Sequence, residues 1–227
     1  MTRVIVISGG SDGLGKTVAK HLSDNNQVII LSKTEERLEK TAEEINCDSY
    51  VCDITNFSEI KETIEKIIGK HGRIDVLINN AGSWIQDKLI ENDYERISDV
   101  IDVNTKGTIY LTKGVLPHML SKEDGLVINV ISQAGINSKE ERSIYVSSKW
   151  AITGFTKSLE KEVAKDGIRV TGLYPGKLKT EMFKKMGIDK DMSDGLDTKE
   201  VARLIEFIIN SDKDVSFPEV GIKNIRN

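Results

Sequence analysis

The sequence is poor in residues that mark several classes of protein. Its two cysteines, Cys47 and Cys52, show no zinc-ligand spacing and have no further partners. The three histidines, His21, His71 and His118, lie far apart with no Cys or Asp cluster around them. We therefore expect two reduced cysteines, no disulfide framework and no metal site.

Long apolar runs and basic clusters are also missing. No apolar run approaches the length needed to span a bilayer. A strand pattern, RVIVIS, begins almost at once, which leaves no room for a signal peptide, so we expect a cytoplasmic protein. The net charge of −4, with no basic run interleaved with aromatics, argues against a nucleic-acid or anionic-membrane partner.

What is present is an alternation of short β-branched runs with longer segments of helical period. The expected strands are Val4–Ser8, Gln27–Leu31, Ser49–Cys52, Val76–Asn79, Leu126–Val130, Ile168–Leu173 and Val220–Ile225. The expected helices are Leu14–Ser23, Glu35–Ile45, Ser58–His71, Val100–Met119, Ser143–Lys165 and Thr198–Asn210. Near-continuous apolar strands indicate a parallel sheet buried on both faces.

The length fits one domain, and we find no repeat or linker. The prediction is a single doubly wound, Rossmann-like α/β domain over residues 1–227, with about seven strands and helices on both faces. Such sheets bind ligands beyond the carboxyl ends of their strands. Each motif described below follows a predicted strand.

A glycine-rich turn, SGGSDGLG, follows the first strand. Gly9, Gly13 and Gly15 are spaced GxxxGxG, so the backbone can turn tightly and approach a pyrophosphate at the helix N-terminus. A triphosphate-binding GxxxxGK[ST] motif is absent, which excludes a kinase or GTPase of that type. A plain tight loop is the alternative, but the position between strand and helix favours a dinucleotide site.

The end of the second strand bears on the choice of cofactor. An NAD site has an acidic residue there for the adenosine ribose, whereas this chain has Ser32 and Lys33. A hydroxyl and an ammonium attract a 2′-phosphate, which favours NADP(H) over NAD(H). Against this, Lys33 is a weaker phosphate ligand than arginine, and Asp12 could oppose the phosphate.

A serine, a tyrosine and a lysine lie around the fifth strand and the helix after it. Tyr145 and Lys149 are four apart and share a helix face, and Ser132 precedes Tyr145 by thirteen residues. A phenol has a pKa near ~10, and lowering it to roughly 7 takes about 4 kcal/mol. We expect the Lys149 ammonium, a nicotinamide cation and a desolvated cleft to supply this together.

These features together resemble the short-chain dehydrogenase/reductase family over nearly the whole chain. The matching elements are the SGGSDGLG turn, Asp53, NNAG (Asn79–Gly82), Asn104 in VNTKG, Ser132, Tyr145, Lys149 and PGKLKT (Pro175–Thr180). Ser8 stands where the family usually has threonine, and the hydroxyl is kept. The C-terminus lacks the glycine-rich final strand of many relatives, which leaves their tetramer contact in question.

The resemblance implies a role for each matched residue. Tyr145 would be the general acid or base, and Lys149 would lower its pKa and bind the nicotinamide ribose. Ser132 would orient the substrate oxygen, and Asn104 would hold a water chain. Asp53 would accept from the adenine amino group, and Thr180 would bond the carboxamide. The implied cofactor set is Gly9, Ser11, Asp12, Gly13, Leu14, Gly15, Ser32, Lys33, Asp53, Ile54, Asn80, Ala81, Gly82, Tyr145, Lys149, Pro175, Gly176 and Thr180.

The predicted function is NADPH-dependent reduction of a small carbonyl compound, or the reverse alcohol oxidation, by hydride transfer. The alternatives are an NAD-dependent alcohol, polyol or hydroxy-acid dehydrogenase and a non-catalytic dinucleotide sensor or interaction protein. Substrate contacts are expected from the loop Ile136–Ser143 and from a lid at residues 177–197, where Met182, Phe183, Met186 and Met192 could line an apolar pocket. A homo-oligomer, a dimer through the two longest helices or a tetramer, is also expected.

Overall fold

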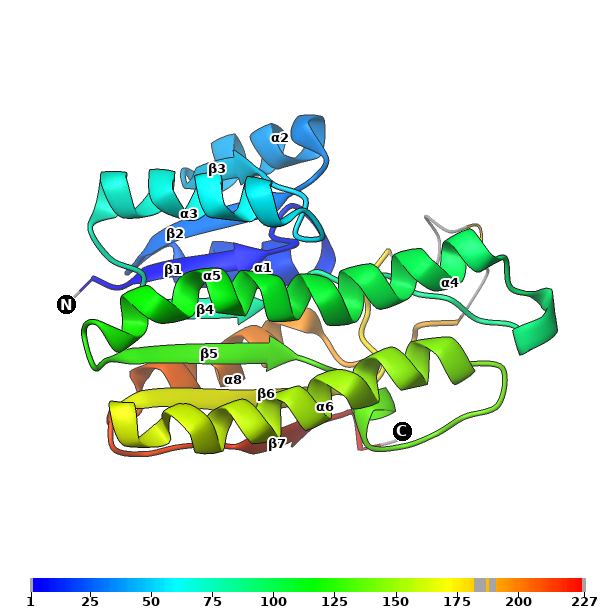
Figure 1. Ribbon diagram of the computed structural model, residues 1–227. Coiled ribbons are helices and arrows are strands. Elements are labelled where there is room, and N and C mark those ends of the chain that lie inside the picture. Colours follow the sequence, from blue (N-terminus) through cyan, green and yellow to red (C-terminus); the bar gives the residue numbers. More distant parts are fainter. Residues whose placement is uncertain (1, 182–186, 188–190, 226–227) are drawn as a thin grey trace.

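The computed structural model describes residues 2–181, 187 and 191–225. At its centre lies a seven-stranded parallel sheet in the order β3-β2-β1-β4-β5-β6-β7, which confirms the doubly wound prediction (Figure 1). The strands are β1 (Val4–Ser8), β2 (Gln27–Ser32), β3 (Asp48–Val51), β4 (Val76–Asn79), β5 (Gly125–Val130), β6 (Ile168–Pro175) and β7 (Glu219–Ile222). The expected bounds are right to within one to three residues, the last strand ending at Ile222 instead of Ile225.

Helices cover both faces of the sheet. They are α1 (Gly13–Leu22), α2 (Glu35–Ile45), α3 (Phe57–His71), α4 (Tyr94–Ile101), α5 (Thr108–Leu120), α6 (Ser143–Val163) and α8 (Thr198–Asn210), with single turns at Leu89–Glu91, Gln133–Gly135 and Ala164–Asp166. One core layer lies between the sheet and α1, α2 and α8. The other lies between the sheet and α3, α5 and α6, which are in front of the strands in Figure 1.

Helix ends are set by local side-chain and backbone chemistry. Asp12, Asn56 and Asp197 cap α1, α3 and α8 by accepting hydrogen bonds from backbone N–H groups of the first turn. Asn46 and Gly72 end α2 and α3 in the left-handed conformation, where a helix cannot continue. Within the described part of the chain, no helix has the length and apolarity to cross a membrane.

The helix expected over Val100–Met119 is longer and less regular than predicted. It begins as α4 at Tyr94, passes through a π-helical turn at Asp102–Gly107 and continues as α5. The π turn adds a residue to the helical repeat, so Asn104 points inward, where it is buried and exchanges hydrogen bonds with Ser83. Periodicity alone could not reveal this, because the cause is a contact with a residue distant in sequence.

The sheet also fixes where a ligand can bind. At the end of β1, Ser8 is in register with Leu31 of β2 and Asn79 of β4, so these three strands end at one edge. The chain leaves β1 toward α1 on one face and reaches α5 on the other from β4, which makes this edge the switch point of the sheet. Ligands of doubly wound sheets bind in the crevice at such a point.

Candidate active site

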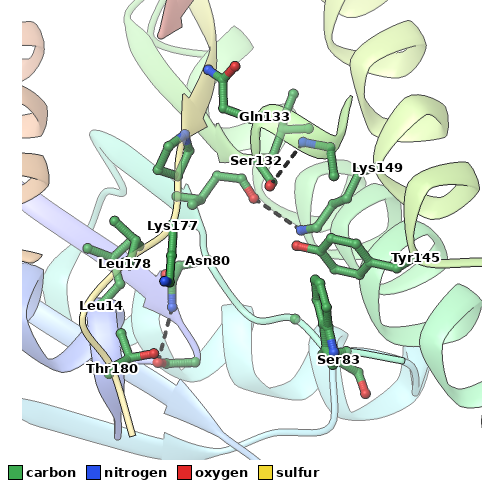
Figure 2. A pocket seen from close by; sticks show the side chains of 18 of the residues that line it. Leu14, Asn80, Ser83, Ser132, Gln133, Tyr145, Lys149, Lys177, Leu178 and Thr180 are labelled. Atoms are coloured by element: carbon green, nitrogen blue, oxygen red, sulfur yellow. Dashed lines mark hydrogen bonds between the residues drawn. The ribbon is translucent and has the colours of Figure 1, made fainter. Parts of the chain in front are cut away.

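A cavity of about 650 Å³ opens at this edge of the sheet. It runs from the glycine turn, with Gly9 and Gly13, to the start of α6, with Tyr145 and Lys149. Figure 2 shows Tyr145 and Lys149 on one side of it and Leu14, Leu178 and Thr180 on the other. Residues from five separate segments of the chain therefore meet in one space.

The glycine turn has a backbone that larger residues would disturb. Gly9 and Gly13 have φ angles of 66° and 50°, in the left-handed region that favours glycine. A Cβ on Gly15 would lie 2.2 Å from the Gly9 carbonyl oxygen, so this helix residue must also be small. The turn thus brings main chain and the N-terminus of α1 directly to the cavity, as an anion site requires.

Ser8 locks this turn to the segment after β4. Its hydroxyl accepts hydrogen bonds from the backbone N–H groups of Asn80 and Ala81, both at 3.1 Å. Asn80 returns bonds from its amide Nδ2 to the carbonyls of Ser8 and Gly9, at 3.1 and 3.2 Å. The hydroxyl kept at position 8 therefore joins the two walls of the cavity, where Asn80, Ala81 and Gly82 line it.

Part of the expected cofactor set lies beside the cavity without lining it. These residues are Gly15, Ser32, Lys33, Asp53 and Ile54. Ser32 bonds Ser11, and one oxygen of Asp53 accepts from Thr55, while Lys33 is exposed.

The cation that lines this end of the cavity is Arg37, which the sequence analysis overlooked. Arg37 lies one turn into α2 and pairs with Asp12 at 3.5 Å. It could have been found by asking which basic residue near the start of the second predicted helix faces the glycine-rich turn.

At the opposite end, Ser132, Tyr145 and Lys149 come together as predicted from their spacing. Lys149 is 6% exposed and lies with its Nζ 5.8 Å from the Tyr145 ring centre and 3.4 Å from the Val130 carbonyl oxygen. Ser132 follows β5 with a φ of 135°, a strained value for a non-glycine residue, and its hydroxyl accepts from the Ala134 N–H. Strained backbone at a cavity wall is typical of functional sites.

Burial governs the pKa values of both ionisable groups. Burial raises the pKa of Tyr145, and hydrogen bonding to Ser132 and the charge of Arg142 act against it without reversing it. Burial also lowers the pKa of the Lys149 ammonium to about 8. We expected a desolvated cleft to help lower the pKa of Tyr145. It has the opposite effect, because removing water favours the neutral phenol. Any lowering of the Tyr145 pKa must come from hydrogen bonds, such as that to Ser132, and from charges.

Asn104 does not line the cavity, but it lies directly behind it. Its Nδ2 donates to the Ser83 carbonyl and the Ser148 hydroxyl, both at 2.9 Å, and its Oδ1 accepts from the Ser83 N–H at 2.7 Å. A Cβ placed on Gly82 would lie 3.3 Å from Asn104 Oδ1 and 3.7 Å from Lys149 Nζ. Asn104 and Lys149 thus converge on Gly82, with Asn104 holding the segment after β4.

The loop before α6 forms the outer wall, as expected for residues 136–143. Asn137, Ser138, Lys139 and Arg142 line the cavity from this loop, and Trp84 lines it from the segment after β4.

The expected lid fits the described structure less fully. Its two ends pair at Leu178 and Leu196, and Met192 lies outside the cavity lining. Met182, Phe183 and Met186 fall outside the described residues. No group of three His, Cys, Asp or Glu side chains among the described residues could hold a metal ion.

With this geometry in view, comparison with known proteins is informative. A sequence model of the short chain dehydrogenase family matches residues 3–191. The chain belongs to this family. It is 33% identical to an uncharacterized oxidoreductase of Staphylococcus saprophyticus over 98% of this chain and 97% of that protein. As a short-chain dehydrogenase/reductase, it is an oxidoreductase enzyme.

Solved structures agree. An alcohol dehydrogenase of the archaeon Thermococcus sibiricus, complexed with 5-hydroxy-NADP, matches with a TM-score of 0.91 and 26% identity, covering 100% of this chain and 98% of that one. ElxO with NADP bound matches with a TM-score of 0.88 and 30% identity, covering 98% and 97%. The fold of a short-chain dehydrogenase/reductase is thus present over the whole chain.

Proposed function

We propose that this enzyme reduces a small carbonyl compound with NADPH, using Ser132, Tyr145 and Lys149 to deliver the proton. One observation carries the proposal: these three side chains meet at one end of a cavity whose other end is the glycine turn. The reverse reaction, oxidation of an alcohol, would use the same groups. An NAD-dependent alcohol, polyol or hydroxy-acid dehydrogenase is the alternative that the titration below tests.

The residues present fit a nicotinamide dinucleotide. Main chain at Gly9 and Gly13 and the N-terminus of α1 would hold the pyrophosphate, because these glycines line the cavity and carry no side chain of their own. Asp53 and Ile54 would hold the adenine, and Pro175, Gly176 and Thr180 would hold the nicotinamide end. When bound, the cofactor supplies the hydride that the carbonyl carbon accepts.

The protein's own part is proton delivery. Because burial raises the pKa of Tyr145, its phenol is neutral at pH 7 and carries the proton that the substrate oxygen needs. Ser132 would hold that oxygen by a hydrogen bond as negative charge develops on it. Lys149 stays mostly protonated below its pKa of about 8, so it would stabilise the phenolate left behind. A tyrosine that is protonated at neutral pH is in the form that the reduction requires.

The preference for NADPH rests on charge at the adenosine end. Ser32 ends β2 where an NAD site would have a carboxylate, and Arg37 lines the cavity as a planar, permanently charged ligand for a phosphate. We give Arg37 this role ahead of Lys33, which does not line the cavity. The Thermococcus enzyme and ElxO were both solved with NADP-type cofactors, which supports the same choice.

The experiment is a pair of binding titrations with NADPH and NADH, followed by tryptophan and nicotinamide fluorescence. Trp84 lines the cavity and should give the signal, whereas Trp150 is 51% exposed and does not line it. We expect NADPH to bind at least about tenfold more tightly, or about 1.4 kcal/mol. Arg37→Gln should remove most of that preference. A preference for NADH would overturn the NADPH assignment, and binding of neither would overturn the proposed function.

Other expectations from the sequence stay predictions. These are the single domain over residues 1–227, the lid at 177–197, the cytoplasmic location and the homo-oligomer. A dimer through α5 and α6 can be tested by the mass of the protein in solution.

A further inference from the structure

A second cation reaches the reaction end of the cavity. Arg142, the residue immediately before α6, lines the cavity together with Lys139. Among the described lining residues the only carboxylate is Asp12, and it lies at the glycine turn, next to Arg37. Lys177, which also lines the cavity, pairs with Asp194. Among the described residues of the lining, the reaction end therefore has cations without a carboxylate to neutralise them.

Arg142 is held in place by an aromatic ring and keeps its hydrogen-bond donors available. Its Cζ lies 5.0 Å from the Trp84 ring centre, and the Trp84 ring centre lies 4.3 Å from that of Tyr145. A guanidinium that lies over an aromatic ring is attracted through its charge, so its N–H donors can still form hydrogen bonds. In the described part of the chain, no hydrogen bond or ion pair joins the Arg142 side chain to another residue.

The guanidinium is also close to the reacting group. The distance from the Arg142 Cζ to the Tyr145 ring centre cannot exceed the sum of the 5.0 Å from Cζ to the Trp84 ring and the 4.3 Å from that ring to Tyr145. Its charge acts on the Tyr145 phenol, where it opposes the effect of burial on the pKa. Arg142 and Tyr145 thus face the same part of the cavity, within the span of a small molecule.

We propose that the substrate is an oxo acid: its carbonyl group meets Tyr145, and its carboxylate binds the guanidinium of Arg142. This deepens the proposed function and rests on it. The product is the corresponding hydroxy acid, since hydride adds to the carbonyl carbon, Tyr145 gives its proton to the oxygen, and the carboxylate is unchanged. A planar guanidinium with free in-plane donors matches a carboxylate by paired N–H···O bonds. A neutral carbonyl compound would leave this cation without a partner in the closed complex.

The test compares acids with their own methyl esters. NADPH oxidation is followed with 2-, 3-, 4- and 5-oxo acids of matched chain length and with the esters, which keep the carbonyl and lose the charge. For the best spacing we expect wild-type kcat/KM to favour the acid by about tenfold to a hundredfold, as charged hydrogen bonds allow. Arg142→Gln should bring that ratio to within about twofold of one, and Arg142→Lys should retain part of it.

The acid-to-ester ratio is the readout because Arg142 also acts on Tyr145, and that effect changes both rates alike. Arg203→Gln is the matched control, since Arg203 pairs with Glu200 on α8, outside the cavity lining, and the variant should keep the wild-type ratio. An acid-to-ester ratio near one in the wild-type enzyme would refute the oxo-acid assignment, and a ratio that survives Arg142→Gln would refute Arg142 as the carboxylate ligand; both outcomes would leave carbonyl reduction intact. If no acid, ester or simple ketone is reduced although NADPH binds, the proposed function fails, and this inference fails with it.

Discussion

The two ends of the cavity differ in whether main chain or side chains form most of the wall. At the glycine turn the wall is main chain, shaped by Gly9, Gly13 and Gly15 and locked by the Ser8 hydroxyl. At the reaction end the wall consists of side chains, from Ser132, Tyr145, Lys149 and the loop before α6.

Substitutions should affect the two ends of the cavity in different ways. The main chain of the glycine turn is disturbed by an added side chain, since a Cβ on Gly15 would lie 2.2 Å from the Gly9 oxygen. A wall of side chains keeps its shape when one is trimmed but loses its chemistry. Substitutions at the first end should therefore change binding and stability, and those at the second should change turnover.

The sharpest test of this contrast is Tyr145→Phe, which removes one hydroxyl and leaves the ring against Trp84. Turnover should fall by about 10²- to 10⁴-fold, because proton delivery by a positioned group contributes that much. Affinity for NADPH should stay within about twofold. The measurement is steady-state reduction together with a binding titration. A variant that turns over at the parent rate would show that Tyr145 is not the proton donor.

The variant Lys149→Met distinguishes the contribution of Lys149 to turnover from its effect on the stability of the folded protein. Below pH 8 the Lys149 ammonium is charged in both folded and unfolded chains, so the folded protein bears the full cost of burying it, about 3 kcal/mol for a pKa lowered from 10.5 to about 8. Between those values the unfolded chain binds more protons, so wild-type stability rises with pH.

We expect the methionine variant to be inactive yet more stable at pH 7, by up to about 3 kcal/mol. This advantage should disappear by about pH 10.5. Urea unfolding of both proteins at several pH values measures it. Parallel pH dependence in the two proteins would mean that Lys149 is not desolvated.

Gly15→Ala examines the main-chain end. The added Cβ would lie 2.2 Å from the Gly9 oxygen, so the turn or α1 must shift, at about 1–3 kcal/mol and with loss of NADPH affinity. Gly69→Ala in α3 is the control: a Cβ there meets nothing within 4 Å, and it should stabilise the helix by roughly 0.5–1 kcal/mol. Thermal unfolding and the cofactor titration measure both. Equal behaviour of the two variants would contradict the close packing of the turn.

Much of the fold could be predicted because local chemistry specifies it. Strands β1 and β4 are apolar up to their last residues, Ser8 and Asn79, and both prove buried along their whole length. Capping by Asp12 and Asp197 marks the starts of α1 and α8. The spacing of apolar residues does not predict the π turn at Asn104, whose side chain bonds Ser83 and Ser148, both far from it in sequence.

The sequence by itself determined the parallel sheet, the glycine turn and the grouping of Ser132, Tyr145 and Lys149, because each follows from short-range spacing and strand order. Only the tertiary structure decided which cation lines each end of the cavity: Arg37 in place of Lys33 at the glycine turn, and Arg142 over the Trp84 ring near Tyr145. It also decided that burial raises the pKa of the tyrosine. Charges act through space and desolvation depends on every surrounding atom, so neither can be read from residue spacing.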